Sequence, residues 1–210
     1  MVALEWVGAP YRLCRVEKAL AGSALFLRVN PRGQVPVLRV GGRTLLETNA
    51  ILAHIADRRP DLPLLPPHRS WERDVANQWL AYLGSGFHPT FWRYYAPARY
   101  ARDPTMHEAI RLAAVDAIRR ELGRVDAHLE GKDFIQGDRI SLLDVYLHSM
   151  DRWASKIVDM PREYANVWRH QKLTARDPAV RLAVAVERGD EPPPAATPSA
   201  FAGHIALGDL

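Results

Sequence analysis

Two short stretches of the chain carry residue types that could hold a small peptide by its main chain and by its charged end. Val35-Pro36 enters an extended segment, and Glu47-Thr48 opens a helical one. A cis bond before Pro36 would leave the N–H and C=O of Val35 free to pair, strand-fashion, with an extended peptide. The Glu47 carboxylate could hold an ammonium group, and the helix start capped by Thr48 offers free N–H groups to an anion. An acceptor beside donors suits the zwitterionic head of an amino acid.

Each stretch also has an interpretation that needs no ligand. Pro36 could be a trans proline at the start of an edge strand, where a missing ladder donor is tolerated. Thr48 could be an ordinary N-cap. Taken one at a time, these structural alternatives stay open.

Short elements with clear signals surround both stretches. Residues 2–7 are typical of a helix end closed by Gly8, and residues 11–16 of a strand. Residues 35–40 and 43–46 flank the Gly-Gly pair at 41–42, a strong hairpin signal. A helix follows over 48–56. The first part of the chain is therefore a small mixed α/β unit.

The pattern changes to helical periodicity after a proline-rich stretch near residues 59–67. Helices are expected over 70–95, from Asp103-Pro104 to about residue 129, from Ser141, and from Asp177-Pro178 to the prolines at 192–194. We predict an α/β domain over residues 1–62, an all-helical domain over 69–188, and a Pro/Ala-rich tail over 189–210.

Composition narrows the class of protein. The 210 residues carry a formal net charge of +4, and basic residues alternate with acidic ones rather than forming a block, so no nucleic-acid partner is expected. No apolar run is long enough for a membrane span and no signal peptide is evident, so we expect no membrane association and a cytoplasmic location. Cys14 is the only cysteine, and the eight histidines are scattered, so neither an internal disulfide nor a metal site is expected.

Three motifs resemble the glutathione transferase family, in its bacterial, beta-like form. The first is residues 30–36 (NPRGQVP), followed by the hairpin and Glu47-Thr48. The second is residues 137–144 (GDRISLLD), in which Ser141 and Asp144 form a capping box with a role in folding. The third is residues 79–92, which contain His88 and Trp92. The resemblance covers roughly residues 2–188.

The resemblance implies a thioredoxin-like N-terminal domain, a helical C-terminal domain and a homodimer. It implies glutathione as co-substrate, with Val35 and Pro36 at its cysteinyl backbone and Glu47 and Thr48 at its γ-glutamyl end. Gln34 and Arg32 are neighbours that could reach the glycyl carboxylate.

The family's activity would be transfer of glutathione to an apolar electrophilic small molecule, with His88 and Trp92 lining the pocket for that molecule. These two residues could equally belong to the core. The alternative function is a binding or scaffold protein that keeps the fold without turnover.

The N-terminal sequence departs from the family pattern. In the family, a strand and a loop carrying a catalytic Ser, Cys or Tyr come first, whereas residues 3–11 here resemble the end of the following helix. The α/β domain is therefore expected to be incomplete and the catalytic residue is unknown; a truncated start and a natural non-catalytic form are both open. Cys14 is expected to be a small packed residue rather than a replacement nucleophile. The apolar stretch over 201–207 could fold back onto surface left exposed.

Overall fold

The computed structural model describes residues 1–190 and 199–210, which fall into two compact units. The first unit contains Met1–Leu62 and Arg181–Leu210, and the second contains Pro63–Val180. The boundary between Leu62 and Pro63 lies within the proline-rich stretch near residues 59–67. The C-terminal residues, expected as a separate tail beginning at 189, group instead with the first unit. The prolines at 192–194, predicted to end the last helix, lie outside the described residues.

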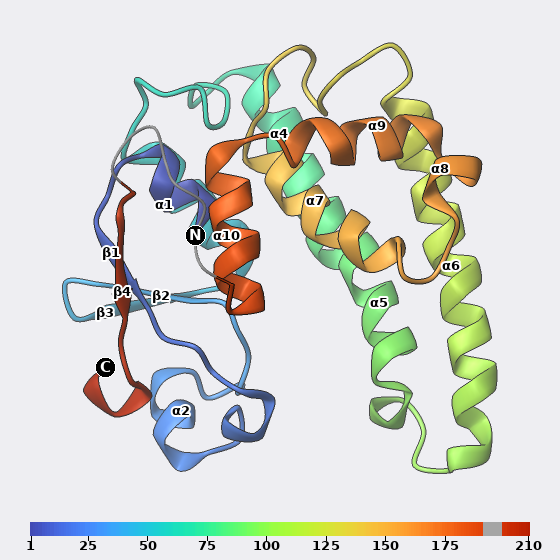
Figure 1. Ribbon diagram of the computed structural model, residues 1–210, viewed down its shortest axis with the longest axis horizontal. Coiled ribbons are helices and arrows are strands. Elements are labelled where there is room, and N and C mark those ends of the chain that lie inside the picture. Colours follow the sequence, from blue (N-terminus) through green and yellow to red (C-terminus); the bar gives the residue numbers. More distant parts are fainter. Residues whose placement is uncertain (191–198) are drawn as a thin grey trace. The chain divides into compact units, whose positions relative to one another are not determined.

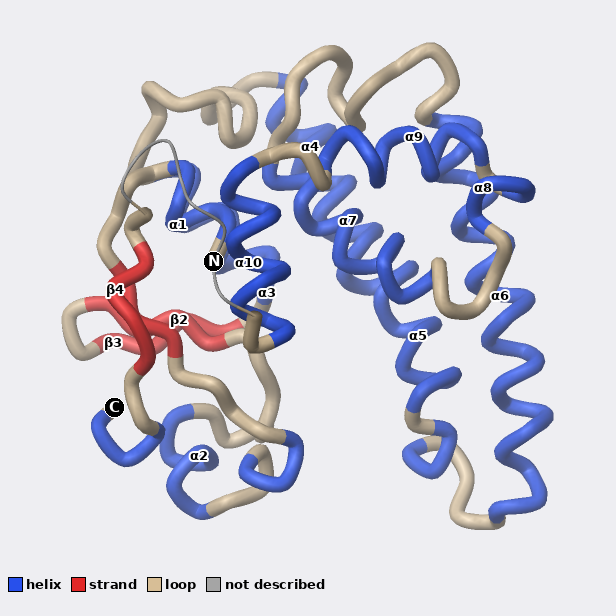
Figure 2. The backbone as a smooth tube through the Cα atoms, viewed as in Figure 1, coloured by secondary structure: helices blue, strands red, loops and turns tan. Residues whose placement is uncertain are grey.

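The first unit combines short helices with two small sheets (Figure 2). Along the chain it contains α1 (Val2–Trp6), β1 (Tyr11–Leu13), α2 (Ala24–Val29), β2 (Val37–Val40), β3 (Arg43–Leu46), α3 (Thr48–Asp57) and, near the C-terminus, β4 (Phe201–His204). β2 and β3 form the predicted hairpin, with Val40 opposite Arg43. Gly41 and Gly42 both have positive φ, as a two-residue hairpin turn requires.

The second sheet of this unit was only partly foreseen. β1 pairs in parallel with β4, and Tyr11 lies opposite Phe201. Part of the apolar stretch 201–207 thus folds back onto the N-terminal region, as the sequence suggested. The predicted strand over 11–16 is shorter than expected. The unit's buried apolar residues come from both ends of the sequence and are Val2, Ala3, Phe26, Ile51, Ile55, Ala56, Leu182 and Val186.

The second unit is helical (Figure 1). It contains α4 (Trp71–Ala81), a π-helical turn (Tyr82–Phe87), α5 (His88–Tyr95), α6 (His107–His128), α7 (Leu142–Ala154), α8 (Met160–Glu163) and α9 (Ala165–Thr174). α10 (Pro178–Arg188) begins here and continues into the first unit. The predicted helix over 70–95 is therefore three successive segments. The buried residues of α6 are spaced three or four positions apart and form one apolar stripe, namely Ala114, Ile118, Leu122 and Val125.

Helix ends in the second unit follow the expected chemistry. Ser70 caps α4 by accepting a hydrogen bond from the Arg73 N–H. Ser141 caps α7, and Asp144 bonds back to the Ser141 N–H, so the predicted capping box is present. Each cap satisfies N–H groups that a helix start otherwise leaves unpaired. α9 was not predicted, because its sequence combines a low average hydrophobicity with no strong start signal.

Candidate functional site

The loop before β2 is shaped by two of its own residues. Asn30 is buried; its side-chain amide donates to the Gln34 carbonyl (2.6 Å) and its side-chain oxygen accepts from the Arg32 N–H (3.0 Å). Gly33 has φ +61°, and a Cβ on it would lie 2.6 Å from the Ala21 carbonyl oxygen. Only glycine fits both the conformation and the space. The loop is therefore held in one shape by Asn30 and Gly33.

This loop presents Val35 and Pro36 to solvent. The peptide bond between them is cis, which decides between the cis and trans geometries that the sequence left open, and Val35 is 64% exposed although it is apolar. Among the described residues, none hydrogen-bonds to the Val35 N–H or C=O. An exposed valine with a free main chain next to a strand can accept another extended chain.

The start of α3 differs from the prediction in one respect. The helix begins at Thr48, so Glu47 and not Thr48 occupies the N-cap position, and Glu47 makes no side-chain capping bond. Glu47 has φ 67° and ψ 124°, a conformation that costs on the order of 1–3 kcal/mol for a residue with a side chain. Because Glu47 does not cap, its carboxylate can bond to groups outside the helix, while the first N–H groups of α3 keep their capacity to bind an anion.

Arg32 connects the loop to this helix start. Its guanidinium donates to the Glu47 carboxylate at 2.5 Å, and both side chains are 63% exposed. The role of Arg32 at the glycyl carboxylate stays a prediction, and in the structure its guanidinium pairs with Glu47. The structure thus brings Arg32 and Glu47, 15 residues apart in the sequence, to one place on the first unit.

A second candidate region lies within the helical unit. His88, the first residue of α5, is half-buried, and its ring lies 6.3 Å from Trp92 and 5.4 Å from Trp153 between centroids. Burial lowers the pKa of His88, which favours the neutral ring. Trp92 is 40% exposed and stacks against the Arg99 guanidinium at 4.5 Å. The rings of His88 and Trp92 lie near each other on one helix, so their assignment to a pocket for an electrophile stays a prediction.

Two features of this region were missed from the sequence. Trp153, at the far end of α7, has no sequence spacing that relates it to His88. The π-helical turn directly before His88 contains Gly84 and Gly86, and π-turns are frequent at functional sites. Tyr82 opens the turn, and its hydroxyl donates to Glu121 of α6 at 2.7 Å. The glycine pair was the available signal.

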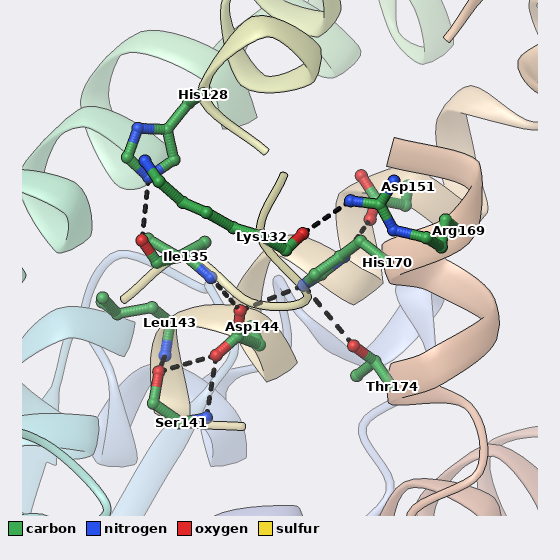
Figure 3. Close-up of polar contacts among 10 residues, drawn as sticks. All are labelled: His128, Lys132, Ile135, Ser141, Leu143, Asp144, Asp151, Arg169, His170 and Thr174. Atoms are coloured by element: carbon green, nitrogen blue, oxygen red, sulfur yellow. Dashed lines mark hydrogen bonds and ion pairs between the residues drawn. The ribbon is translucent and has the colours of Figure 1, made fainter. Parts of the chain in front are cut away.

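The capping box belongs to a larger buried polar cluster (Figure 3). The Asp144 carboxylate accepts from the N–H groups of Ile135 and Ser141, each at 2.8 Å, and from the Ser141 hydroxyl. His170 of α9 lies with Nε2 3.0 Å from Asp144 and Nδ1 3.3 Å from Asp151, and all three side chains are fully buried. Because both ring nitrogens face carboxylates, the protonated ring can donate to both.

The charges in this cluster perturb one another. Burial disfavours the charged His170 ring, but hydrogen bonds to Asp144 and Asp151, together with their charges, outweigh it and raise the pKa of His170 to about 9. Burial raises the pKa of Asp151 to about 6, against the bond to His170. The cluster joins α7 to α9. Because none of these three side chains reaches solvent, they cannot contact a substrate. His170 and Asp151 were not predicted.

Other chemistry is limited in the described part of the chain. Burial raises the pKa of the Cys14 thiol, which disfavours the reactive thiolate and agrees with the expected packing role. No group of three or more His, Cys, Asp or Glu side chains among the described residues is arranged to hold a metal ion. Within the same residues, no helix has the length and apolar character needed to cross a membrane.

The structure by itself places the protein in one class: proteins that join a mixed α/β unit with a cis-proline loop to a helical unit. Residues 1–57 match the family described as glutathione S-transferase, N-terminal domain. A glutathione S-transferase of Xanthomonas campestris, GST-4.5, is 34% identical over 155 residues, covering 74% of this chain and 76% of the relative.

Solved structures agree with the sequence comparison. A sphingomonad glutathione S-transferase complexed with glutathione superposes with a TM-score of 0.79 at 33% identity, covering 89% of this chain and 92% of the other. A beta-class enzyme of Sphingomonas chungbukensis gives a TM-score of 0.77, also at 33% identity, covering 89% and 90%. The chain belongs to the glutathione S-transferase family, with a thioredoxin-like N-terminal domain and a mostly helical C-terminal domain.

Proposed function

We propose that this protein binds glutathione through the cis-proline loop and the start of α3, and transfers its sulfur to an electrophilic small molecule. One observation carries the proposal: the first unit contains both an exposed Val35 with an unpaired main chain and a Glu47 whose backbone is held at positive φ. The sphingomonad relative at 33% identity, solved in complex with glutathione, supports the choice of ligand.

Each proposed binding residue has a distinct task. Val35 exchanges main-chain hydrogen bonds with the cysteinyl residue of glutathione, and Pro36 fixes the turn that exposes Val35. Glu47 holds the γ-glutamyl ammonium group, while Thr48 and the N–H groups of the first turn of α3 hold the γ-glutamyl carboxylate. Gln34 lies next to Val35 and contacts the remaining part of the tripeptide.

The reaction requires a glutathione thiolate that attacks the electrophile. With a chloronitrobenzene, a carbon–sulfur bond forms, the carbon–chlorine bond breaks and chloride leaves with the bonding electrons. Binding both reactants contributes chiefly by orientation and proximity. His88 and Trp92 supply the apolar, aromatic surface for the electrophile, and no residue is assigned to stabilise the thiolate. We propose further that the protein works as a homodimer in the cytoplasm.

Calorimetric titration with glutathione tests the binding step. We expect Glu47→Gln to weaken binding about tenfold or more, because a neutral amide replaces a charge-assisted bond to the ammonium group. Glu108→Gln is the matched control, since Glu108 is likewise exposed and paired with an arginine but lies on α6. Equal affinity for glutathione in the wild type and Glu47→Gln would contradict the assigned site.

Conjugation of a chloronitrobenzene, followed by absorbance, tests the transfer step separately. We expect His88→Leu and Trp92→Leu to change turnover or the KM for the electrophile while the affinity for glutathione is kept. If the wild-type protein binds glutathione but gives no conjugate, the transferase function is wrong and the binding or scaffold function is supported.

A further inference from the structure

The strand formed near the C-terminus is attached to the first unit by hydrogen bonds at both of its ends. The Tyr11 N–H donates to the Ala200 carbonyl and the Ile205 N–H donates to the Leu13 carbonyl, each at 3.0 Å. Between these bonds, β4 runs parallel to β1 (Figure 1). A pair of parallel strands this far apart in the sequence is a non-local contact, and within the described residues β4 is the only strand that pairs with β1.

Glu5 of α1 recognises the residues just before the strand. Its carboxylate accepts from the Ser199 hydroxyl and from the Ala200 N–H, each at 3.0 Å. The Ser199 oxygen in turn accepts from the Phe201 N–H at 3.0 Å. A carboxylate that accepts hydrogen bonds from two donors of one short segment fixes the position and the register of that segment.

Residues along β4 alternate between partly buried and exposed positions, as in a strand with one face against the protein. Phe201, Gly203 and Ile205 are partly buried, whereas Ala202 and His204 are exposed. The Phe201 ring lies 5.6 Å from the Tyr11 ring between centroids. One face of the segment therefore contacts the first unit, with an aromatic contact at its start.

A bulge in β4 makes the fit dependent on one glycine. Tyr11 and Leu13, two residues apart, lie opposite Phe201 and His204, three residues apart. Gly203, at φ +90°, takes up the extra residue, and a β-branched residue is a strong outlier at such a φ. The register of the segment is thus set by Glu5 at one end and by Gly203 within it.

We propose that β1 is a strand-acceptor site whose ligand is this chain's own segment Ser199–Ile205, so that the first unit is completed by the C-terminus and a free peptide of that sequence can occupy the same place. The mode of recognition is strand addition, with main-chain bonds for affinity and the Glu5, Tyr11 and Gly203 contacts for specificity. The inference is independent of glutathione binding.

The test uses the full chain with a site for a sequence-specific protease in place of residues 191–198. After cleavage of the folded protein, we expect the C-terminal fragment to stay with the main body in gel filtration and to exchange with a labelled synthetic peptide of residues 199–210. A peptide of the same composition in scrambled order should not exchange. Release of the fragment on cleavage, with no change in Tm and no rebinding of the peptide, would overturn the proposal.

A second measurement uses the uncut chain and matched glycine variants. Hydrogen exchange at the Tyr11 and Ile205 amides should be slow in the wild type and in Gly208→Val, because Gly208 has no positive φ and open space around it. Gly203→Val should speed exchange at both amides at least tenfold. Equal protection in the two variants, or unprotected amides in the wild type, would refute the strand-acceptor site.

Discussion

Replacement of Asp144 by asparagine removes the charge at the centre of the buried cluster while keeping its shape. One carboxylate oxygen accepts from the Ile135 N–H and His170, and the other accepts from the N–H and hydroxyl of Ser141. An amide has only one oxygen, so its NH2 group must face two of these donors. The backbone N–H of either Ile135 or Ser141 therefore loses its acceptor, and the His170 cation loses one of its counter-ions.

The expected loss of stability follows from these contacts. Breaking a fully buried ion pair by neutralising one partner costs about 3–5 kcal/mol, because the other charge stays buried. A buried N–H left without an acceptor costs about 1–3 kcal/mol by itself, so a smaller loss of this size remains even if His170 loses its proton. We therefore expect Asp144→Asn to lower the free energy of unfolding by about 3–5 kcal/mol near pH 6.5.

Urea unfolding followed by tryptophan fluorescence measures this loss. Asp116→Asn is the control, because Asp116 lies exposed on α6, and it should change the unfolding free energy by no more than about 0.5 kcal/mol. The deficit of Asp144→Asn should shrink at pH 9.5, where His170 is mostly neutral in the wild type as well. A deficit below about 1 kcal/mol at pH 6.5 would refute the view that Asp144 is the centre of a buried charged network.

Three further outcomes are expected. Since the pKa of His170 rises from 6.5 to about 9 on folding, its contribution is complete below pH 6.5 and is lost as the pH rises to 9, by about 3 kcal/mol in the unfolding free energy; a urea midpoint constant over this range would contradict it. Leu143→Ala, fully buried on α7, should cost about 2–5 kcal/mol in urea unfolding, whereas Leu112→Ala, 60% exposed, should cost far less. Gly33→Ala should lower the Tm and Gly22→Ala should not, because only Gly33 combines a positive φ with a close backbone neighbour; equal Tm values would show that the loop adapts.

Local sequence signals determined the elements whose stability comes from neighbouring residues. The Gly41-Gly42 turn, the Ser141–Asp144 capping box and the buried stripe of α6 each depend on contacts within a few positions, so spacing alone located them. The cis-proline loop was not decided by local signals, since Pro36 could equally be a trans edge-strand proline, and it was recognised only through the resemblance of residues 30–36 to the family motif.

Contacts between distant segments were decided only by the tertiary structure. Nothing near Asp144 in the sequence indicates that His170 closes the buried cluster, or that Trp153 lies beside His88. The pairing of Arg32 with Glu47 joins residues on either side of the hairpin, so local spacing could not indicate it. Thr48 was predicted to be the N-cap because threonine is a common residue at that position. The backbone of Glu47 makes Glu47 the N-cap instead, so the helix begins one residue earlier than that prediction implies. The apolar character of residues 201–207 indicated that this segment folds back, but not that it pairs with β1. The partner and the register depend on Glu5 and Gly203, which are too far apart in the sequence for a local pattern to connect them.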